Sequence, residues 1–204
     1  MKKTFFQRTY NLNIKLISFG ILSFIIKIGI NLFIQTIEKI QTYGMQGFLT
    51  PVLNKLTTLE SYLQPLSFCL IFLPTILIII ELVHRFLKDS LWNYFKSIYQ
   101  TSLMRRFLKQ DEQSESMNMV ENQTITRINP ILKSFNHSIL GCTVDVRKEN
   151  ITVVLAIPRT QQAQKLLKEM EDDIKEEISN RNPHYYFSSP HRKGNKLWFT
   201  GTKR

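Results

Sequence analysis

Residues 66–80 read Leu-Ser-Phe-Cys-Leu-Ile-Phe-Leu-Pro-Thr-Ile-Leu-Ile-Ile-Ile and contain no charged side chain. The apolar run continues to Val83, and its 18 residues are close to the ~20 that a helix needs to cross the hydrocarbon core of a bilayer. A second run of the same length covers residues 16–33 and is interrupted by Lys27. Cores of soluble proteins rarely hold such runs, and no small-residue cleavage pattern follows the first one, so both are predicted to be membrane-spanning helices.

The charges that flank the two runs predict their orientation. Residues 1–15 carry four cations and no acid, residues 34–65 carry two charges of each sign, and residues 85–110 carry six cations against Asp89 alone. Lys and Arg collect on the cytoplasmic side of a membrane, so residues 1–15 are expected as a basic cytoplasmic tail and residues 34–65 as an outer loop. We expect a two-span plasma-membrane protein, with residues 16–83 as the hairpin and both termini inside.

Lys27 needs a separate explanation because a cation within a span is costly. By helix rise it lies roughly 16 Å from the inner boundary of its span, whereas Glu81 lies only about 3 Å from that boundary. A direct pair between the two is therefore not expected. The preferred interpretations are that Lys27 extends outward to water or pairs with another subunit, and both suit an oligomer or a hetero-complex.

Residues 84–110 are predicted to form a basic amphipathic helix on the inner membrane surface. Aromatic rings favour the headgroup level, and cations favour the anionic lipids of the inner leaflet, which is the expected lipid partner. The side chains assigned to this surface are Arg85, Lys88, Trp92, Lys96, Arg105, Arg106 and Lys109.

The remainder of the chain is predicted to be a linker and a small cytoplasmic domain. Residues 111–124 are polar and acidic without periodicity, which is typical of a linker. In residues 125–204, a helical pattern is followed by two strand patterns, and this order then occurs a second time. The predicted fold is an α+β domain of order α-β-β-α-β-β with an antiparallel sheet, in which Pro130 starts or ends the first helix and Gly194-Asn195 forms the last turn.

The last hairpin combines cations with aromatic rings and is the candidate surface for a partner or nucleic acid. Strand alternation places Leu197 and Phe199 on one face and Trp198 on the other. Whether Trp198 points outward with the cations or into a core stays open at this level. The candidate residues are Tyr186, Arg192, Lys193, Lys196, Trp198, Lys203 and Arg204.

No motif of a catalytic site is present in the 204 residues. There is no Walker A loop, nucleophile elbow or dinucleotide fingerprint, and the four histidines lack the spacing of metal ligands. Cys69 and Cys142 are expected to be free thiols, since one lies in a span and the other in the cytoplasmic part. Acids in residues 169–177 pair with lysines four positions away, as on a solvated helix face. We expect no enzymatic activity, cofactor or metal.

The layout of residues 1–110 resembles that of the membrane anchors of coupling proteins in conjugative DNA-transfer systems. That resemblance implies DNA transfer, or type IV secretion, as an example of the process. With a net charge of +11, the chain is expected to act as an accessory subunit of an envelope complex whose domain docks a protein partner or nucleic acid. An oligomeric pore gated by the domain and a ligand-sensing regulator of a membrane partner are the alternatives.

Overall fold

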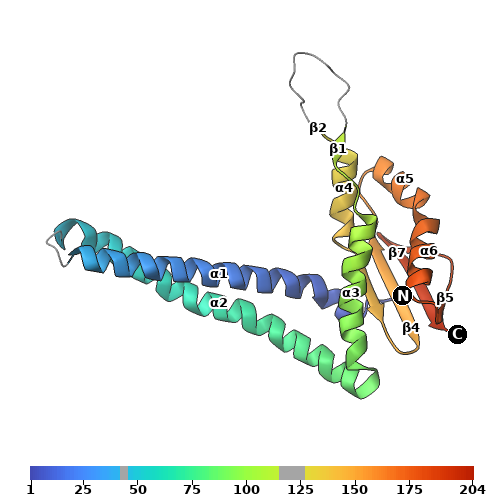
Figure 1. Ribbon diagram of the computed structural model, residues 1–204, viewed down its shortest axis with the longest axis horizontal. Coiled ribbons are helices and arrows are strands. Elements are labelled where there is room, and N and C mark those ends of the chain that lie inside the picture. Colours follow the sequence, from blue (N-terminus) through green and yellow to red (C-terminus); the bar gives the residue numbers. More distant parts are fainter. Residues whose placement is uncertain (42–45, 115–126) are drawn as a thin grey trace, which may run out of the picture. The chain divides into compact units, whose positions relative to one another are not determined.

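A computed structural model describes residues 1–41, 46–114 and 127–204 of the chain (Figure 1). The chain forms two compact units. One consists of Arg8–Glu81, and the other combines Met1–Gln7 with Leu82–Arg204. We call them the hairpin unit and the domain unit.

The hairpin unit contains most of two long helices, α1 (Phe5–Gln41) and α2 (Gln46–Lys88). The first three residues of α1 and the last seven of α2 belong to the domain unit. They have 37 and 43 residues, so they measure about 55 and 65 Å at 1.5 Å per residue. Apolar side chains such as Phe19 and Phe68 point outward, with 59% and 71% of their surface exposed. Both helices are long and apolar enough to cross a membrane, as expected from the sequence.

The helices extend through most of the expected outer loop. Residues 34–41 complete α1 and residues 46–65 begin α2, while residues 42–45 lie outside the described part of the chain. The segment 34–65 between the two apolar runs is therefore largely helical, while its position outside the membrane stays a prediction. The apolar side chains that recur at helical spacing from Val52 onward continue the pattern of the second span. Pro51 is the sixth residue of α2 and lies inside the helix, so its missing N–H removes one helical hydrogen bond.

Contacts between α1 and α2 define their register. Gly20 lies against Ile71, since a Cβ built on Gly20 would be 2.7 Å from Ile71 Cγ1. Lys27 Nζ donates to Gln64 Oε1 at 3.2 Å, a partner within the same chain. Pairing of Lys27 with another subunit stays a prediction. In this antiparallel register, residues 16–25 face residues 66–75, and the two apolar runs overlap over only about 15 Å.

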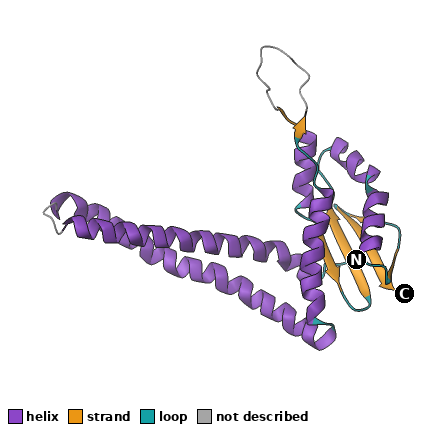
Figure 2. Ribbon diagram, viewed as in Figure 1, coloured by secondary structure: helices purple, strands orange, loops and turns teal. Residues whose placement is uncertain are grey.

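The domain unit contains a five-stranded antiparallel sheet of order β3-β4-β7-β5, with β6 also paired to β7 (Figure 2). A separate two-residue ribbon pairs β1 with β2. Its elements are α3 (Leu91–Leu108), β1 (Gln113–Ser114), β2 (Arg127–Ile128), α4 (Pro130–Ile139), β3 (Thr143–Val146), β4 (Asn150–Ala156), α5 (Gln161–Glu169), α6 (Glu171–Arg181), β5 (Tyr185–Phe187), β6 (His191–Lys193) and β7 (Lys196–Lys203).

Local chemistry explains where several elements begin and end. Helix α4 starts at Pro130 because Asn129 caps it, with Asn129 Oδ1 accepting from Ile131 N at 2.9 Å. Where one helix is expected after Thr160, α5 and α6 meet at Met170. Gly194 turns the chain between β6 and β7 with φ of 59°, a left-handed conformation that favours glycine. Of the expected linker 111–124, residues 115–124 lie outside the described residues.

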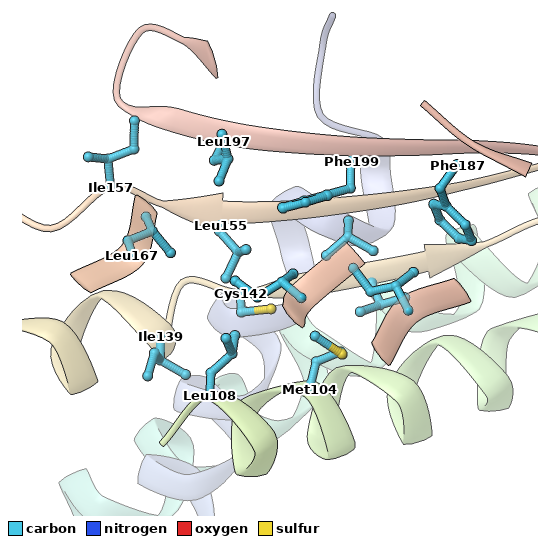
Figure 3. Packing of buried hydrophobic residues seen from close by; sticks show 14 of the residues in the cluster. Met104, Leu108, Ile139, Cys142, Leu155, Ile157, Leu167, Phe187, Leu197 and Phe199 are labelled. Atoms are coloured by element: carbon cyan, nitrogen blue, oxygen red, sulfur yellow. The ribbon is translucent and has the colours of Figure 1, made fainter. Parts of the chain in front are cut away.

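One face of the sheet packs against helices and forms the core (Figure 3). Leu155, Leu197 and Phe199 extend from the strands, while Met104 and Leu108 reach them from α3. Val144 pairs with Val153 and Val146 with Ile151 in the β3–β4 ladder, and all four belong to this core. Alternation of side chains along each strand therefore defines the core face, as expected for an antiparallel sheet with one face covered.

Candidate functional site

Helix α3 lies along β3, an edge strand of the sheet, and hydroxyl groups of the helix bond to the strand backbone. Val144 N donates to Thr101 Oγ1 at 3.0 Å, and Val146 N donates to Ser97 Oγ at 2.9 Å. Both helix residues are fully buried and lie four positions apart, so they share one face of α3. The two side-chain oxygens accept the hydrogen bonds that the carbonyl groups of a neighbouring strand would otherwise accept from β3.

Arg105 on the same helical face and Asp89, which precedes α3, continue this contact at its two ends. Arg105 Nε and Nη2 donate to Cys142 O at 3.0 and 2.7 Å, and Lys148 N donates to Asp89 Oδ1 at 2.8 Å. An uncovered edge strand is a template for unwanted pairing with other chains. Polar side chains at regular spacing on the helix thus satisfy the edge of the sheet.

Arg85 lies at one end of this contact and is completely buried. Its guanidinium forms an ion pair with Asp145 and donates to Val146 O at 3.0 Å. A second carboxylate, that of Asp89, lies 3.6 Å from Nη1, and Arg147 Nε is 3.0 Å from the other oxygen of Asp145. Two cations and two carboxylates therefore balance one another, as buried charges require.

Two aromatic rings complete the surroundings of Arg85. Its Cζ lies 5.3 Å from the centre of the Phe6 ring and 5.7 Å from that of Tyr94. The rings meet edge to face, with centroids 5.6 Å apart. Cation–π attraction adds to the ion pair in a site without water contact. Residue 6 comes from the N-terminal segment, so this cluster joins three distant parts of the chain.

These contacts correct part of the predicted membrane surface. Arg85 is buried in an ion-pair cluster, and Arg105 is half-buried with its guanidinium bonded to Cys142 O, so neither presents a free cation to a membrane. The reason is that the partners of Arg85 are groups of β3 and that of Arg105 is the backbone of Cys142 just before β3, which local sequence cannot reveal. The other residues assigned to this surface stay exposed or half-buried, namely Lys88, Trp92, Lys96, Arg106 and Lys109.

The side of α3 that faces away from β3 carries large apolar side chains. Ser97, Gln100 and Thr101 are buried on the same helix as the core residues Met104 and Leu108, so α3 departs from the usual arrangement in which polar residues face solvent. The exposed fractions are 72% for Phe86, 73% for Leu87, 75% for Trp92, 58% for Phe95 and 62% for Tyr99. We call these five residues, from the end of α2 and the first half of α3, the outer face.

The structure corrects the placement of Trp198. It lies on the sheet face opposite the core, as alternation predicts, yet only 3% of it is exposed. Among the described residues, its Nε1 has no hydrogen-bond partner. Two observations place the N-terminal segment on the sheet. Gln7 Nε2 donates to Thr152 O at 3.0 Å. The pKa of Lys3 is lowered by burial and by the nearby charge of Lys196 on β7. Because the core fills the other face, the N-terminal segment covers the face that bears Trp198, so this ring cannot stack on bases.

The cations expected to act together lie in two groups. Lys193 pairs with Lys196 beside the β6–β7 turn, with Arg192 next to them, whereas Lys203 lies at the far end of β7. The seven-residue separation along β7 corresponds to about 23 Å. The second group consists of Lys203, Arg204 and the ring of Tyr186, which is 66% exposed. The binding roles of these residues stay predictions.

A groove of about 440 Å³ next to the β6–β7 turn brings in residues that sequence reasoning missed. Its lining includes the apolar side chains of Leu167 and Leu197. The charged residues of the lining are the cations Arg192, Lys165 and Lys168 and the acid Glu171. The two lysines were interpreted only as ion-pair partners on a solvated helix, and Lys165 does lie 3.8 Å from Glu169. Lys165 and Lys168 come near Arg192 because α5 lies beside the β6–β7 hairpin of the domain unit. Within the described ranges, no group of three potential metal ligands occurs.

Comparisons with known proteins find no relative of this chain: no family model matches it, and neither does any curated protein or solved structure. Its function is therefore inferred from its own residues.

Proposed function

We propose that the chain is a non-enzymatic, membrane-anchored accessory subunit of an envelope complex, whose small domain docks a partner in the cytoplasm. The observation that carries this proposal is the direct passage from a candidate span into the domain. Residues 82–88 complete the apolar helix α2 and already belong to the domain unit, where Arg85 is buried. A chain built this way holds its domain at the membrane.

The contacts of the N-terminal segment support a common side for both ends of the hairpin. Met1–Gln7 precede the first candidate span, yet they belong to the domain unit, and Gln7 bonds to Thr152 O. Because Met1–Gln7 and Leu82–Arg204 belong to one unit, the simplest arrangement is that the chain between them crosses the membrane an even number of times. The excess of Lys and Arg in residues 1–15 and 85–110 supports the cytoplasmic side of the plasma membrane.

The use of polar groups in the domain supports docking in preference to catalysis. Buried polar side chains such as Ser97, Thr101 and Asp145 bond to backbone groups or to one another and hold elements together. The exposed cations of the β6–β7 turn and the groove beside it suit an acidic protein surface or nucleic acid. DNA transfer is the example that the layout of residues 1–110 suggests.

Membrane extraction and protease protection test the anchoring. The full chain should stay in membranes washed with alkaline carbonate. A tag after Arg204 should be cut in inverted vesicles and protected in right-side-out ones. Release by carbonate contradicts the anchoring, and the opposite protection pattern contradicts the cytoplasmic side.

Binding of DNA by the full chain in nanodiscs tests the nature of the partner. Micromolar binding that weakens steeply as salt rises supports nucleic acid. The double variant Arg192→Glu/Lys193→Glu should then bind more weakly than Lys203→Glu/Arg204→Glu, which makes the same charge change at the other end of β7. Absence of binding at low salt removes nucleic acid from the proposal and leaves a protein partner.

A further inference from the structure

We propose that the outer face of α3 inserts among the headgroups of an anionic leaflet, so that the domain rests on the membrane through this helix. The inference depends on the proposed membrane anchoring and adds to it the surface that touches lipid. The outer face consists of Phe86, Leu87, Trp92, Phe95 and Tyr99.

The helical positions of the three outer-face residues on α3 place them on one side of that helix. Within α3, Trp92, Phe95 and Tyr99 recur after three and four residues, so they follow one another along the same side. Thr101 and Ser97 lie on the opposite side and bond to β3. Attachment of that side to the sheet holds the aromatic side outward, and contiguous exposed apolar surface marks a contact with a protein or a membrane.

The chemistry of the face favours lipid headgroups as its partner. Tyr and Trp rings combine an apolar body with a polar group and are enriched where a membrane meets water. The exposed and half-buried cations of the same segment are Lys88, Lys96, Arg106 and Lys109.

The charge of the same region complements anionic lipid. The only acid in residues 85–110 is Asp89, and just 4% of its side chain is exposed because it faces Arg85 and accepts from Lys148 N. The outer face is thus surrounded by positive charge without an exposed carboxylate of its own. Cations near an anionic membrane surface are attracted to it.

Chain connectivity brings the outer face to the membrane surface. Helix α2, which contains a candidate span, ends at Lys88, and α3 begins at Leu91 after Ser90, whose backbone is extended. Three Cα–Cα steps join Lys88 to Leu91, so these two residues lie at most about 11 Å apart. The first turns of α3 therefore lie next to the end of the span, and the 18 residues of α3 extend over about 27 Å from that point.

The two tryptophans of the chain provide a direct test. Trp92 is 75% exposed on the outer face and Trp198 is 3% exposed, so Trp198→Phe leaves a reporter on the face and Trp92→Phe leaves a buried control. The full chain is reconstituted in phosphatidylcholine vesicles containing one third phosphatidylglycerol. Phosphatidylcholines brominated near the headgroup or deep in the acyl chain serve as quenchers of tryptophan fluorescence.

We expect shallow bromines to quench Trp92 several-fold more strongly than deep bromines, and Trp198 to be quenched by neither. Fluorescence of Trp92 that shallow bromolipids leave unchanged but aqueous acrylamide quenches would overturn the inference, as would equal quenching of both tryptophans. Carbonate treatment of the same vesicles separates the two proposals: a chain released by carbonate is not anchored, whereas a retained chain with an unquenched Trp92 refutes only the contact of α3.

Charge reversal tests the role of anionic lipid. Lys88→Glu/Lys96→Glu, made in the Trp198→Phe background, should reduce the shallow quenching of Trp92 in vesicles with phosphatidylglycerol. Lys133→Glu, an exposed lysine on α4, is the control and should leave the quenching unchanged. Equal quenching in the double variant and the parent would contradict an anionic headgroup as the partner.

Discussion

Arg85 and Asp145 form a buried ion pair although sixty residues separate them in the chain. The pair joins the end of α2 to the edge strand β3. Burying two charges is costly, and the cost is offset only by close pairing and by further hydrogen bonds. Both conditions hold, since Arg85 also donates to Val146 O and Asp145 also accepts from Arg147.

Arg85→Met should destabilise the domain by about 3–5 kcal/mol, because it leaves the buried carboxylate of Asp145 with one partner fewer. Denaturant unfolding of the purified chain in detergent, followed by near-UV circular dichroism, measures the change. The double variant Arg85→Met/Asp145→Leu removes both charges and should recover part of the loss. A single variant as stable as the parent would show that the pair contributes nothing.

Thr101→Val should cost about 1–3 kcal/mol, since the Val144 N–H then loses its acceptor in a site closed to water. The size of the side chain is retained, so packing changes little. Ser102→Ala is the matched control, because Ser102 is exposed on the same helix and its loss should change stability by less than about 0.5 kcal/mol. Hydrogen exchange should be faster at the Val144 amide in the first variant only. Unchanged exchange there would contradict the role of α3 as the cover of the sheet edge.

Gly20→Leu should weaken the packing of α1 on α2, whereas Gly29→Leu should not. A Cβ at Gly20 would lie 2.7 Å from Ile71 Cγ1, while one at Gly29 meets nothing within 4 Å. Overpacking of this kind costs about 1–3 kcal/mol. Thermal unfolding of the two variants in the same detergent provides the comparison. If both variants melt together, the register of the two helices is wrong.

Cys142 should make the domain less stable as the pH rises from 9 to 12. Burial raises the pKa of the Cys142 thiol from 9.0 to about 12, so the thiol stays protonated in the folded chain while it ionises in the unfolded chain. Its contribution is complete below pH 9 and is lost as the pH approaches 12, by up to about 1.4 kcal/mol per pH unit.

Cys142→Ala removes this titration but no other. The unfolding free energy of the variant should therefore fall less steeply over the same pH range, and the comparison of slopes cancels the lysines and tyrosines that titrate in both proteins. Parallel slopes would mean that the thiol is accessible to water in the folded chain.

Local pattern was sufficient for the features that depend on neighbouring residues. Uncharged runs such as 66–80 predict helices long and apolar enough to cross a membrane, because few other environments accept them. Two-residue alternation predicted the antiparallel sheet and the shared face of Leu197 and Phe199. A glycine beside an asparagine at Gly194 marked the final turn.

What covers each face depended on partners far along the chain. The sequence indicates that Arg85 and Trp198 are cationic and aromatic, but the carboxylate that buries Arg85 is sixty residues away, and the segment over the face of Trp198 comes from the N-terminus. Periodicity shows which side of an element is apolar, and it carries no information about backbone donors on another element. Only the tertiary structure brings Thr101 to the free edge of β3, and so buries its hydroxyl while Trp92, Phe95 and Tyr99 stay outward.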